Sequence, residues 1–265
     1  MQSGLCKFIM VAALAAFAAS PAWAWGRDGH RIVCAVAWDD LTPAAKTRIA
    51  DMINVEDRDA FAESCNWADN YTFFHKETQP WHFVNVPPDA TSVDLARDCP
   101  NGVCVIEKIE TEIRVLRDRT TAEPAATLRF LMHFISDVHQ PMHVSLAADQ
   151  GGNLFKGLYY GQPHNMHGLW DFGMLEHDGR PWREIADMLH GRITVQDRAI
   201  LPKTKPLDWA NESLGITRAR TTAYIPHGDT FELDDAYTQI NLPIAMDRMK
   251  EGAERLAAVL NDLFK

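Results

Sequence analysis

The segment from Leu128 to His143, LRFLMHFISDVHQPMH, constrains this chain more than any other. Its apolar residues recur at helical spacing and predict a buried helix. His133 and Asp137 are four residues apart, so they project from one face of that helix. Pro141 ends or kinks the helix, and His143 follows at once. Imidazole nitrogen and carboxylate oxygen are common zinc donors, so the segment predicts a metal site; the alternative is a core helix with satisfied histidines.

The first 24 residues have the pattern of an export signal. A basic residue precedes a short apolar run, residues 8–19, and Ala22-Trp23-Ala24 matches the A-x-A cleavage pattern. We expect cleavage after Ala24, which leaves a mature domain of residues 25–265. The alternative is a retained membrane anchor; no other run is long and apolar enough to span a bilayer.

Four cysteines remain after the leader is removed, and an even number in an exported chain predicts two disulfides. Cys99 and Cys104 flank a Pro-Asn-Gly turn, which favours a local bridge. Cys34 and Cys65 are then the remaining pair. Metal ligation by cysteine is the weaker interpretation, because the chain has no paired CxxC arrangement.

The remaining pattern predicts a mainly α, single-domain protein with long loops and at most a small β-hairpin. With 265 residues, 46% of them hydrophobic, the composition is that of an ordinary globular domain. We expect helical segments at 32–38, 44–53, 103–117, 165–172, 182–190, 208–220 and 233–263, the last broken at Pro243, and a central helix that begins at Pro124 and ends or kinks at Pro141. Residues 81–88 are expected to be extended, and residues 149–161 to form a loop or weak hairpin.

The net charge of −10 excludes a basic surface as the means of binding a polyanion. If the protein binds phosphate esters, bound cations must supply the attraction locally. Eight side chains are candidate donors for such cations: His30, Asp69, His82, His133, Asp137, His143, His167 and Asp171. His167 and Asp171 repeat the spacing of His133 and Asp137, which suggests more than one metal. Cleavage after Ala24 would add the α-amino group of Trp25 as a ninth donor.

These motifs resemble the S1/P1-type zinc nucleases over nearly the whole mature chain. The marks are WGRDGH at residue 25, WAD at 67, HF at 82, HFISDVHQPMH at 133, GGN at 151, HGLWD at 167 and the terminal ERLAAVLNDLF, all in the family's order. The resemblance implies the multi-helix fold that these nucleases share with zinc phospholipases C. It also implies a bridge between Cys34 and Cys65 that would tie the first helix to the WAD segment.

The resemblance further implies three zinc ions. The first would be held by Asp69, His82, His133 and Asp137, the second by the amine and carbonyl of Trp25 with His30 and Asp137, and the third by His143, His167 and Asp171. Asp137 would thus bridge two ions about 3.5–4 Å apart, a spacing suited to in-line displacement at phosphorus.

The activity implied is endonucleolytic hydrolysis of RNA and single-stranded DNA to 5′-phosphate products, with 3′-nucleotides as further substrates. Asp69 would orient or deprotonate the attacking water. Phe83 would stack on a base, with Asn85 and Asn153 as further substrate contacts; a core role is the alternative for Phe83.

Two positions depart from the family pattern. Asn85 stands where members often carry Asp, which puts base preference in doubt, and Thr72 stands where many carry Arg or Lys, which removes a phosphate clamp. Lys76 is a candidate replacement for that clamp. We expect His139, which lies off the His133 face, to have a supporting or structural role.

Two rival functions follow from the same residues. A zinc phospholipase C would share the fold, but such enzymes usually use Glu where this chain has Asp171, and their gap between His143 and His167 is shorter. A non-catalytic zinc-binding protein would bind metal without turnover. The leader, of bacterial appearance, predicts a periplasmic or secreted protein without a membrane span after processing, and we expect a monomer.

Overall fold

The computed structural model describes residues 25–219, 222, 224 and 230–265, so the expected leader lies outside the described residues. The α-helices of the first half are α1 (Arg27–Asp39), α2 (Pro43–Ile53), α3 (Arg58–Ser64), α4 (Trp67–Phe74), α5 (Leu95–Asp98), α6 (Val105–Arg117) and α7 (Pro124–Val138). Those of the second half are α8 (Met166–Gly168), α9 (Met174–Asp178), α10 (Trp182–Gly191), α11 (Val195–Ile200), α12 (Pro206–Thr217) and α13 (Asp235–Leu263). The protein is mainly helical, as predicted.

Shorter helical turns connect these helices. The 3₁₀ turns are η1 (Lys76–His82), η2 (Pro100–Gly102), η3 (Pro141–His143), η4 (Ala147–Asp149) and η6 (Leu201–Lys203), and η5 (Leu169–Gly173) is a π-helix. The central helix α7 ends one residue after Asp137, and η3 then carries the chain through Pro141 to His143. The break predicted at Pro141 is therefore confirmed.

The strands form two small sheets. β1 (Val84–Val86) pairs in parallel with β2 (Val144–Leu146), and Asn85 lies opposite Ser145. β3 (Lys156–Tyr159) and β4 (Gln162–Asn165) form the expected hairpin, and β5 (Phe231–Leu233) adds a parallel strand beside β3. The parallel pairings join segments far apart in the sequence, so the local pattern predicted only the hairpin.

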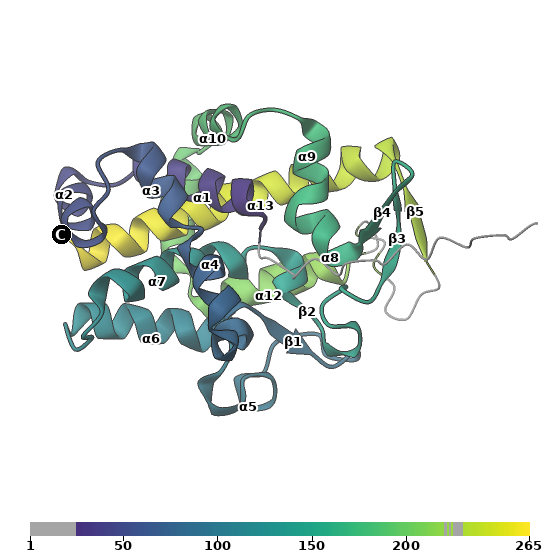
Figure 1. The fold of residues 1–265 in the computed structure, drawn as a ribbon, viewed down its shortest axis with the longest axis horizontal. Coiled ribbons are helices and arrows are strands. Elements are labelled where there is room, and N and C mark those ends of the chain that lie inside the picture. Colours follow the sequence, from purple (N-terminus) through teal and green to yellow (C-terminus); the bar gives the residue numbers. More distant parts are fainter. Residues whose placement is uncertain (1–24, 220–221, 223, 225–229) are drawn as a thin grey trace, which may run out of the picture.

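Helix α7 lies at the centre of the fold. Eleven of its residues are buried, and it packs against α6, α13, α4, α1, α12 and α2. The long helix α13 runs along the molecule beside α1, while the three-stranded sheet lies at one end (Figure 1). Within the described ranges, no helix meets the length and hydropathy needed to cross a membrane.

One helix prediction is wrong. The break expected at Pro243 does not occur, because α13 continues from Asp235 to Leu263 through this proline. Proline removes the hydrogen bond to the carbonyl of Gln239. Both Gln239 and Pro243 are exposed, so water can satisfy that carbonyl and the helix continues.

Both predicted disulfides are present. Cys99 and Cys104 bridge the Pro-Asn-Gly turn, with their Cα atoms 5.3 Å apart. Cys34 and Cys65 join α1 to the residue that follows α3, with their Cα atoms 6.6 Å apart. The second bridge holds α1 against the beginning of the segment that carries Asp69.

Candidate metal centre

His133 and Asp137 project from one buried face of α7, as their spacing predicts. His133 Nδ1 donates to the carbonyl of Cys65 at 2.7 Å, so Nε2 is the nitrogen whose lone pair can bind a metal. That Nε2 lies 3.3 Å from Oδ2 of Asp137 and 3.3 Å from Oδ1 of Asp69. The disulfide-linked Cys65 thus orients a candidate ligand through its main chain.

Helix α4 and turn η1 bring Asp69 and His82 to this face. His82 Nδ1 lies 3.0 Å from Oδ2 of Asp137 and 3.1 Å from Nε2 of His133. On the other side of the ring, Nε2 is 2.9 Å from Oγ1 of Thr72. If Thr72 accepts that N–H, Nδ1 of His82 is left as the donor atom directed at the carboxylates.

The beginning of α1 adds His30 from the opposite side. His30 is fully buried, its ring stacks on that of His133 with centroids 3.9 Å apart, and neither ring nitrogen has a hydrogen-bond partner among the described residues. Its Nε2 is 3.6 Å from Oδ1 of Asp137 and 3.9 Å from Oδ2 of Asp69. The two carboxylate oxygens of Asp137 therefore face different donors, His30 on one side and His82 with His133 on the other.

Trp25 is held firmly beside these residues. Its side chain is fully buried, and its indole Nε1 donates to the carbonyl of Ser136 at 3.0 Å. The next residue, Gly26, donates its backbone N–H to the carbonyl of Asp171 at 2.7 Å. The backbone of Trp25 is thus fixed between the end of α7 and the π-helix η5.

A third group comes from η3, α8 and η5. His143 Nδ1 donates to the carbonyl of His82 at 2.7 Å, and His167 Nδ1 donates to the carbonyl of Gly151 at 2.8 Å. Their Nε2 atoms lie 3.9 and 3.4 Å from the carboxylate of Asp171. Both rings are therefore oriented by backbone carbonyls, with Nε2 directed at the same acid.

The Gly-Gly-Asn loop supports the third group. Gly151 has φ +66°, and a Cβ there would lie 2.8 Å from the carbonyl oxygen of Met142, so glycine is required. The same position is 3.4 Å from both Oδ1 of Asn85 and Nδ1 of His167, which brings Asn85 next to this group. Asn153 donates to the carbonyl of Gln150 at 2.9 Å and closes the loop.

Phe83 lies between His82 and β1 and is half-buried. Its carbonyl accepts from the backbone N–H of Val105 at 3.2 Å. The substrate roles of Phe83, Asn85 and Asn153 stay predictions. The side chain of His139, by contrast, is held away from this group: it donates to the carbonyl of Ile135 at 2.7 Å and accepts from Arg255 at 2.8 Å.

Burial and neighbouring charge set the protonation of these groups. Burial lowers the pKa of His30, His82 and His143 well below its usual value, so these rings are neutral, the form that binds metal. Burial also raises the pKa of Asp137 and Asp171 well above the usual range. Buried carboxylates of this kind need a cation beside them to stay ionised.

The two histidines of the i, i+4 pairs are shifted in opposite directions. Burial opposes the charge on His133, but the carboxylates of Asp137 and Asp69 outweigh it and raise the pKa of His133 to about 9. Burial lowers the pKa of His167 to about 4. The carboxylates of Asp137 and Asp69 act on His133, whereas burial outweighs the effect of the Asp149 carboxylate on His167.

The residues fit a set of divalent cations. Within the part of the chain that the structure describes, the buried ligand atoms without a hydrogen-bond partner are His30 Nδ1 and Nε2, Asp137 Oδ1, His143 Nε2, His167 Nε2 and Asp171 Oδ2. Three groups bring their ligand atoms within 4.8 Å of one another: His30, Asp69 and His133; His82, His133 and Asp137; and His143, His167 and Asp171. Buried polar atoms are normally satisfied, so these clusters are arranged for ions.

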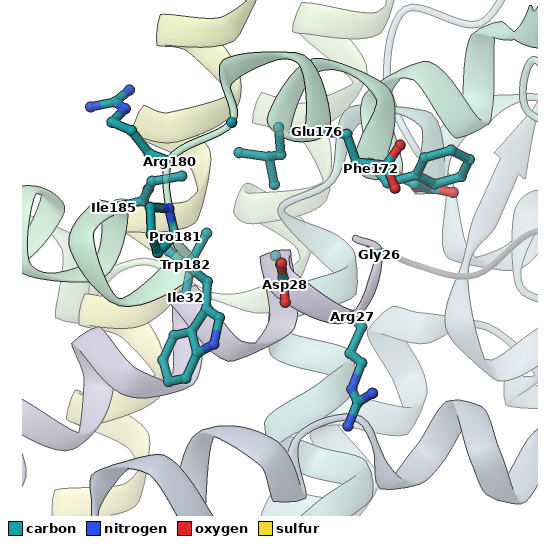
Figure 2. A pocket seen from close by; sticks show the side chains of 14 residues that line it. Gly26, Arg27, Asp28, Ile32, Phe172, Glu176, Arg180, Pro181, Trp182 and Ile185 are labelled. Atoms are coloured by element: carbon teal, nitrogen blue, oxygen red, sulfur yellow. The ribbon is translucent and has the colours of Figure 1, made fainter.

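A cavity of about 510 Å³ lies beside this centre, between the start of α1, helix α9 and helix α10 (Figure 2). Of the predicted ligands only Asp171 is among the described residues that line it, together with Gly26, the neighbour of Trp25, and no predicted substrate residue lines it. The cavity therefore adjoins the centre and does not coincide with it.

The comparison with known sequences agrees with this geometry. A family model described as S1/P1 nuclease matches residues 25–265. The chain belongs to the S1/P1 nuclease family. It is thus a nuclease, a hydrolase of phosphodiester bonds.

Relatives of this S1/P1 nuclease occur in plants and fungi. Endonuclease 2 of Arabidopsis thaliana is 30% identical over 99% of this chain and 99% of its own length. Nuclease P1 of Penicillium citrinum is 27% identical over 90% of this chain and 97% of its own. Nuclease S1 of Aspergillus oryzae is 28% identical over 64% of this chain and 63% of its own.

Sequence reasoning missed several residues that support the ligands of this S1/P1 nuclease. Gln140 donates its amide to Asp171, and Thr72 contacts His82. Asp149 accepts from the backbone N–H of Gly152 at 3.1 Å and from the hydroxyl of Tyr224, which fixes the Gly-Gly-Asn loop. The only available signal was proximity in sequence: Gln140 lies three residues before His143, and Asp149 two before Gly151.

Proposed function

We propose that this S1/P1 nuclease holds three Zn²⁺ ions and hydrolyses RNA and single-stranded DNA to 5′-phosphate products, with 3′-nucleotides as further substrates. One observation carries the proposal. Within a chain of this family, three groups of buried histidine and aspartate side chains present ligand atoms that no group in residues 25–219, 222, 224 and 230–265 satisfies. Nitrogen and oxygen donors in this proportion suit zinc.

The ligand sets we propose are those that the family resemblance implies. Asp137 would serve two ions, since its two oxygens face His30 and the His82–His133 pair respectively. The α-amine and carbonyl of Trp25 would complete the site of His30. The buried indole and the hydrogen bond of Gly26 support this, because together they fix the backbone of Trp25 beside α7.

When bound, the zinc ions supply Lewis-acid stabilisation of phosphate charge and lower the pKa of the attacking water. The carboxylate of Asp69 lies at the edge of the cluster, almost fully buried, and would orient that water and accept its proton. Phe83, half-buried beside His82, would stack on the base next to the cleaved bond. Stacking needs an exposed base face, so single strands are preferred.

We further propose that residues 25–265 form one mature, monomeric domain released from an export signal. Both disulfides favour folding in an oxidising compartment such as a periplasm or the extracellular space. Export also fits the chemistry, since the proposed amine ligand exists only after cleavage.

The deciding experiment compares four substrates with the purified mature protein: single-stranded DNA, RNA, 3′-AMP and phosphatidylcholine. We expect turnover of the first three, abolished by a chelator and restored by zinc. Turnover of the lipid alone would contradict the proposal in favour of a phospholipase. Tight zinc binding with no turnover at all would show a non-catalytic protein.

A further inference from the structure

Two phenylalanines are exposed at the end of α4, the helix that carries Asp69. The side chains of Phe73 and Phe74 are 51% and 80% exposed. Their rings lie edge to face, with centroids 5.0 Å apart at 83°. Adjacent exposed aromatic rings beside a functional centre are a common mark of a binding surface.

The helix turns one of these rings towards the metal centre. Phe73 is four residues after Asp69 and adjacent to Thr72, so these three side chains share one face of α4. Asp69 contacts His133 and Thr72 contacts His82 from that face. Trp67 and Tyr71 occupy the opposite face, where both pack edge-on against Phe130. Phe73 therefore stands about one helical turn, roughly 6 Å along the axis, beyond Asp69.

A lysine accompanies the ring. Lys76 Nζ lies 5.0 Å from the centroid of Phe73. Among the described residues Lys76 makes no ion pair, whereas its neighbour Glu77 is paired with His75 at 3.1 Å. In a chain with net charge −10, a free cation over an exposed aromatic face next to the centre offers what one nucleotide needs: a surface for the base and a charge for the phosphate.

We propose that Phe73 and Lys76, with Phe74 packed against the ring, form an outer nucleotide subsite. Phe73 would stack on a base outside the dinucleotide that is cleaved, and Lys76 would contact that nucleotide's phosphate. The inference rests on the proposed function and adds a second aromatic surface to Phe83. It assigns the site to longer single strands, which extend beyond the cleaved dinucleotide.

The test uses variants of the mature, zinc-loaded protein. Phe73→Leu keeps the apolar bulk but removes the aromatic face, and Phe73→Trp keeps that face. Lys76→Gln removes the charge. Lys46→Gln is the matched control, because Lys46 also lies over an aromatic ring, 5.4 Å from the centroid of Trp38, at a site with no proposed ligand.

Two measurements keep this inference separate from the proposed function. Binding of a fluorescent single-stranded phosphorothioate decamer is followed by anisotropy, and hydrolysis of the decamer and of a dinucleotide is followed in parallel. We expect Phe73→Leu to weaken decamer binding about tenfold, with Phe73→Trp and Lys46→Gln close to the unmodified protein. Lys76→Gln should reduce the slope of log Kd against log salt concentration by about 0.7. Dinucleotide hydrolysis should change less than about twofold in Phe73→Leu, Phe73→Trp and Lys46→Gln.

Three results would overturn the subsite. In the first, Phe73→Leu binds the decamer as tightly as the unmodified protein does. In the second, Phe73→Leu weakens the binding of duplex DNA as much as that of the single-stranded decamer. In the third, Phe73→Leu lowers dinucleotide turnover as much as decamer turnover. Sedimentation that shows a dimer dissolved by Phe73→Leu would instead make the patch a contact between copies and would also reject it. If no substrate is hydrolysed, the proposed function fails, while the binding measurement still decides the subsite.

Discussion

The two His–Asp pairs of this nuclease have the same sequence spacing but different surroundings. His133 and Asp137 sit on a regular fifteen-residue helix at the centre of the fold. His167 lies on the short helix α8, while Asp171 lies on the π-helix that follows. The spacing brings each histidine to its own aspartate, at 3.3 and 3.4 Å, but it does not determine what else approaches.

The surroundings of the two aspartates determine how many ions each carboxylate can bind. Asp137 is shared among histidines from three other segments, namely His30, His82 and His143. Asp171 is instead held by the amide of Gln140, which occupies one of its oxygens. A carboxylate that faces donors on both sides can bridge two ions, whereas one that is held on one side serves a single ion.

The largest expected effect tests this difference directly. Asp137→Asn should remove two zinc equivalents and lower kcat by at least roughly 10³-fold, since each catalytic ion supplies several kcal/mol. Asp171→Asn should remove one equivalent. Zinc content by elemental analysis of the purified variants, beside turnover of single-stranded DNA, checks both. Equal zinc loss from the two variants would show that Asp137 does not bridge.

The next prediction concerns only the proposed ion held by Trp25, His30 and Asp137. One extra residue before Trp25 replaces the α-amine with a peptide nitrogen, which cannot ligate. We expect the loss of one zinc equivalent and a decrease in activity of about 10²–10³-fold, while the ion of His143, His167 and Asp171 stays. The control carries an extra residue at the C-terminus. An extended protein with three zinc ions and normal turnover would reject the amine ligand.

A smaller effect should follow from the residues that orient the ligands. Thr72→Val removes the hydroxyl beside His82, and Gln140→Leu removes the amide that holds Asp171. Each should weaken zinc at its own site about 10- to 100-fold, as measured by competition with a chelator dye. Thr72→Ser retains the hydroxyl and serves as the control. Weakening of the distant site by either variant would show that the two centres are not independent.

These residues also mark the limit of what the sequence could predict. The eight donor side chains and both disulfides follow from spacing and family resemblance, and the structure brings the donors together. Thr72 was interpreted only as a missing phosphate clamp, because its contact with His82 depends on how α4 and η1 fold together. Gln140 and Asp149 act through tertiary hydrogen bonds that leave no periodic signal.

The helical pattern predicted the longer helices, because each buries one apolar stripe against the core, but it missed the short helices α3, α4, α5, α9 and α11. It failed at Pro243, where solvent exposure decides whether a proline breaks a helix. It also missed the parallel pairing of β1 with β2, since sixty residues separate Val84 from its partner Val144. Short strands of three residues carry too little alternation to be recognised alone.

The smallest expected effect is a pH dependence of the metal-free protein that differs between the two pairs. The pKa of His133 is raised to about 9 when folded, so its stabilising proton is present below the unfolded value near 6.5 and lost as pH rises through about 9. The pKa of His167 is lowered to about 4, so its neutral ring favours folding above 6.5, and that contribution is lost as pH falls towards 4. The two histidines thus act on opposite limbs of the stability curve.

Thermal unfolding in a chelator checks this assignment from pH 4 to 9. His133→Asn should flatten the alkaline decrease in Tm and His167→Asn the acid one, each by roughly 2–4 °C per kcal/mol removed. With zinc bound, the alkaline decrease should vanish, because the cation takes the place of the proton on His133. If His133→Asn and His167→Asn changed the stability in the same pH range, the carboxylates of Asp137 and Asp69 would not explain the difference in pKa between the two histidines.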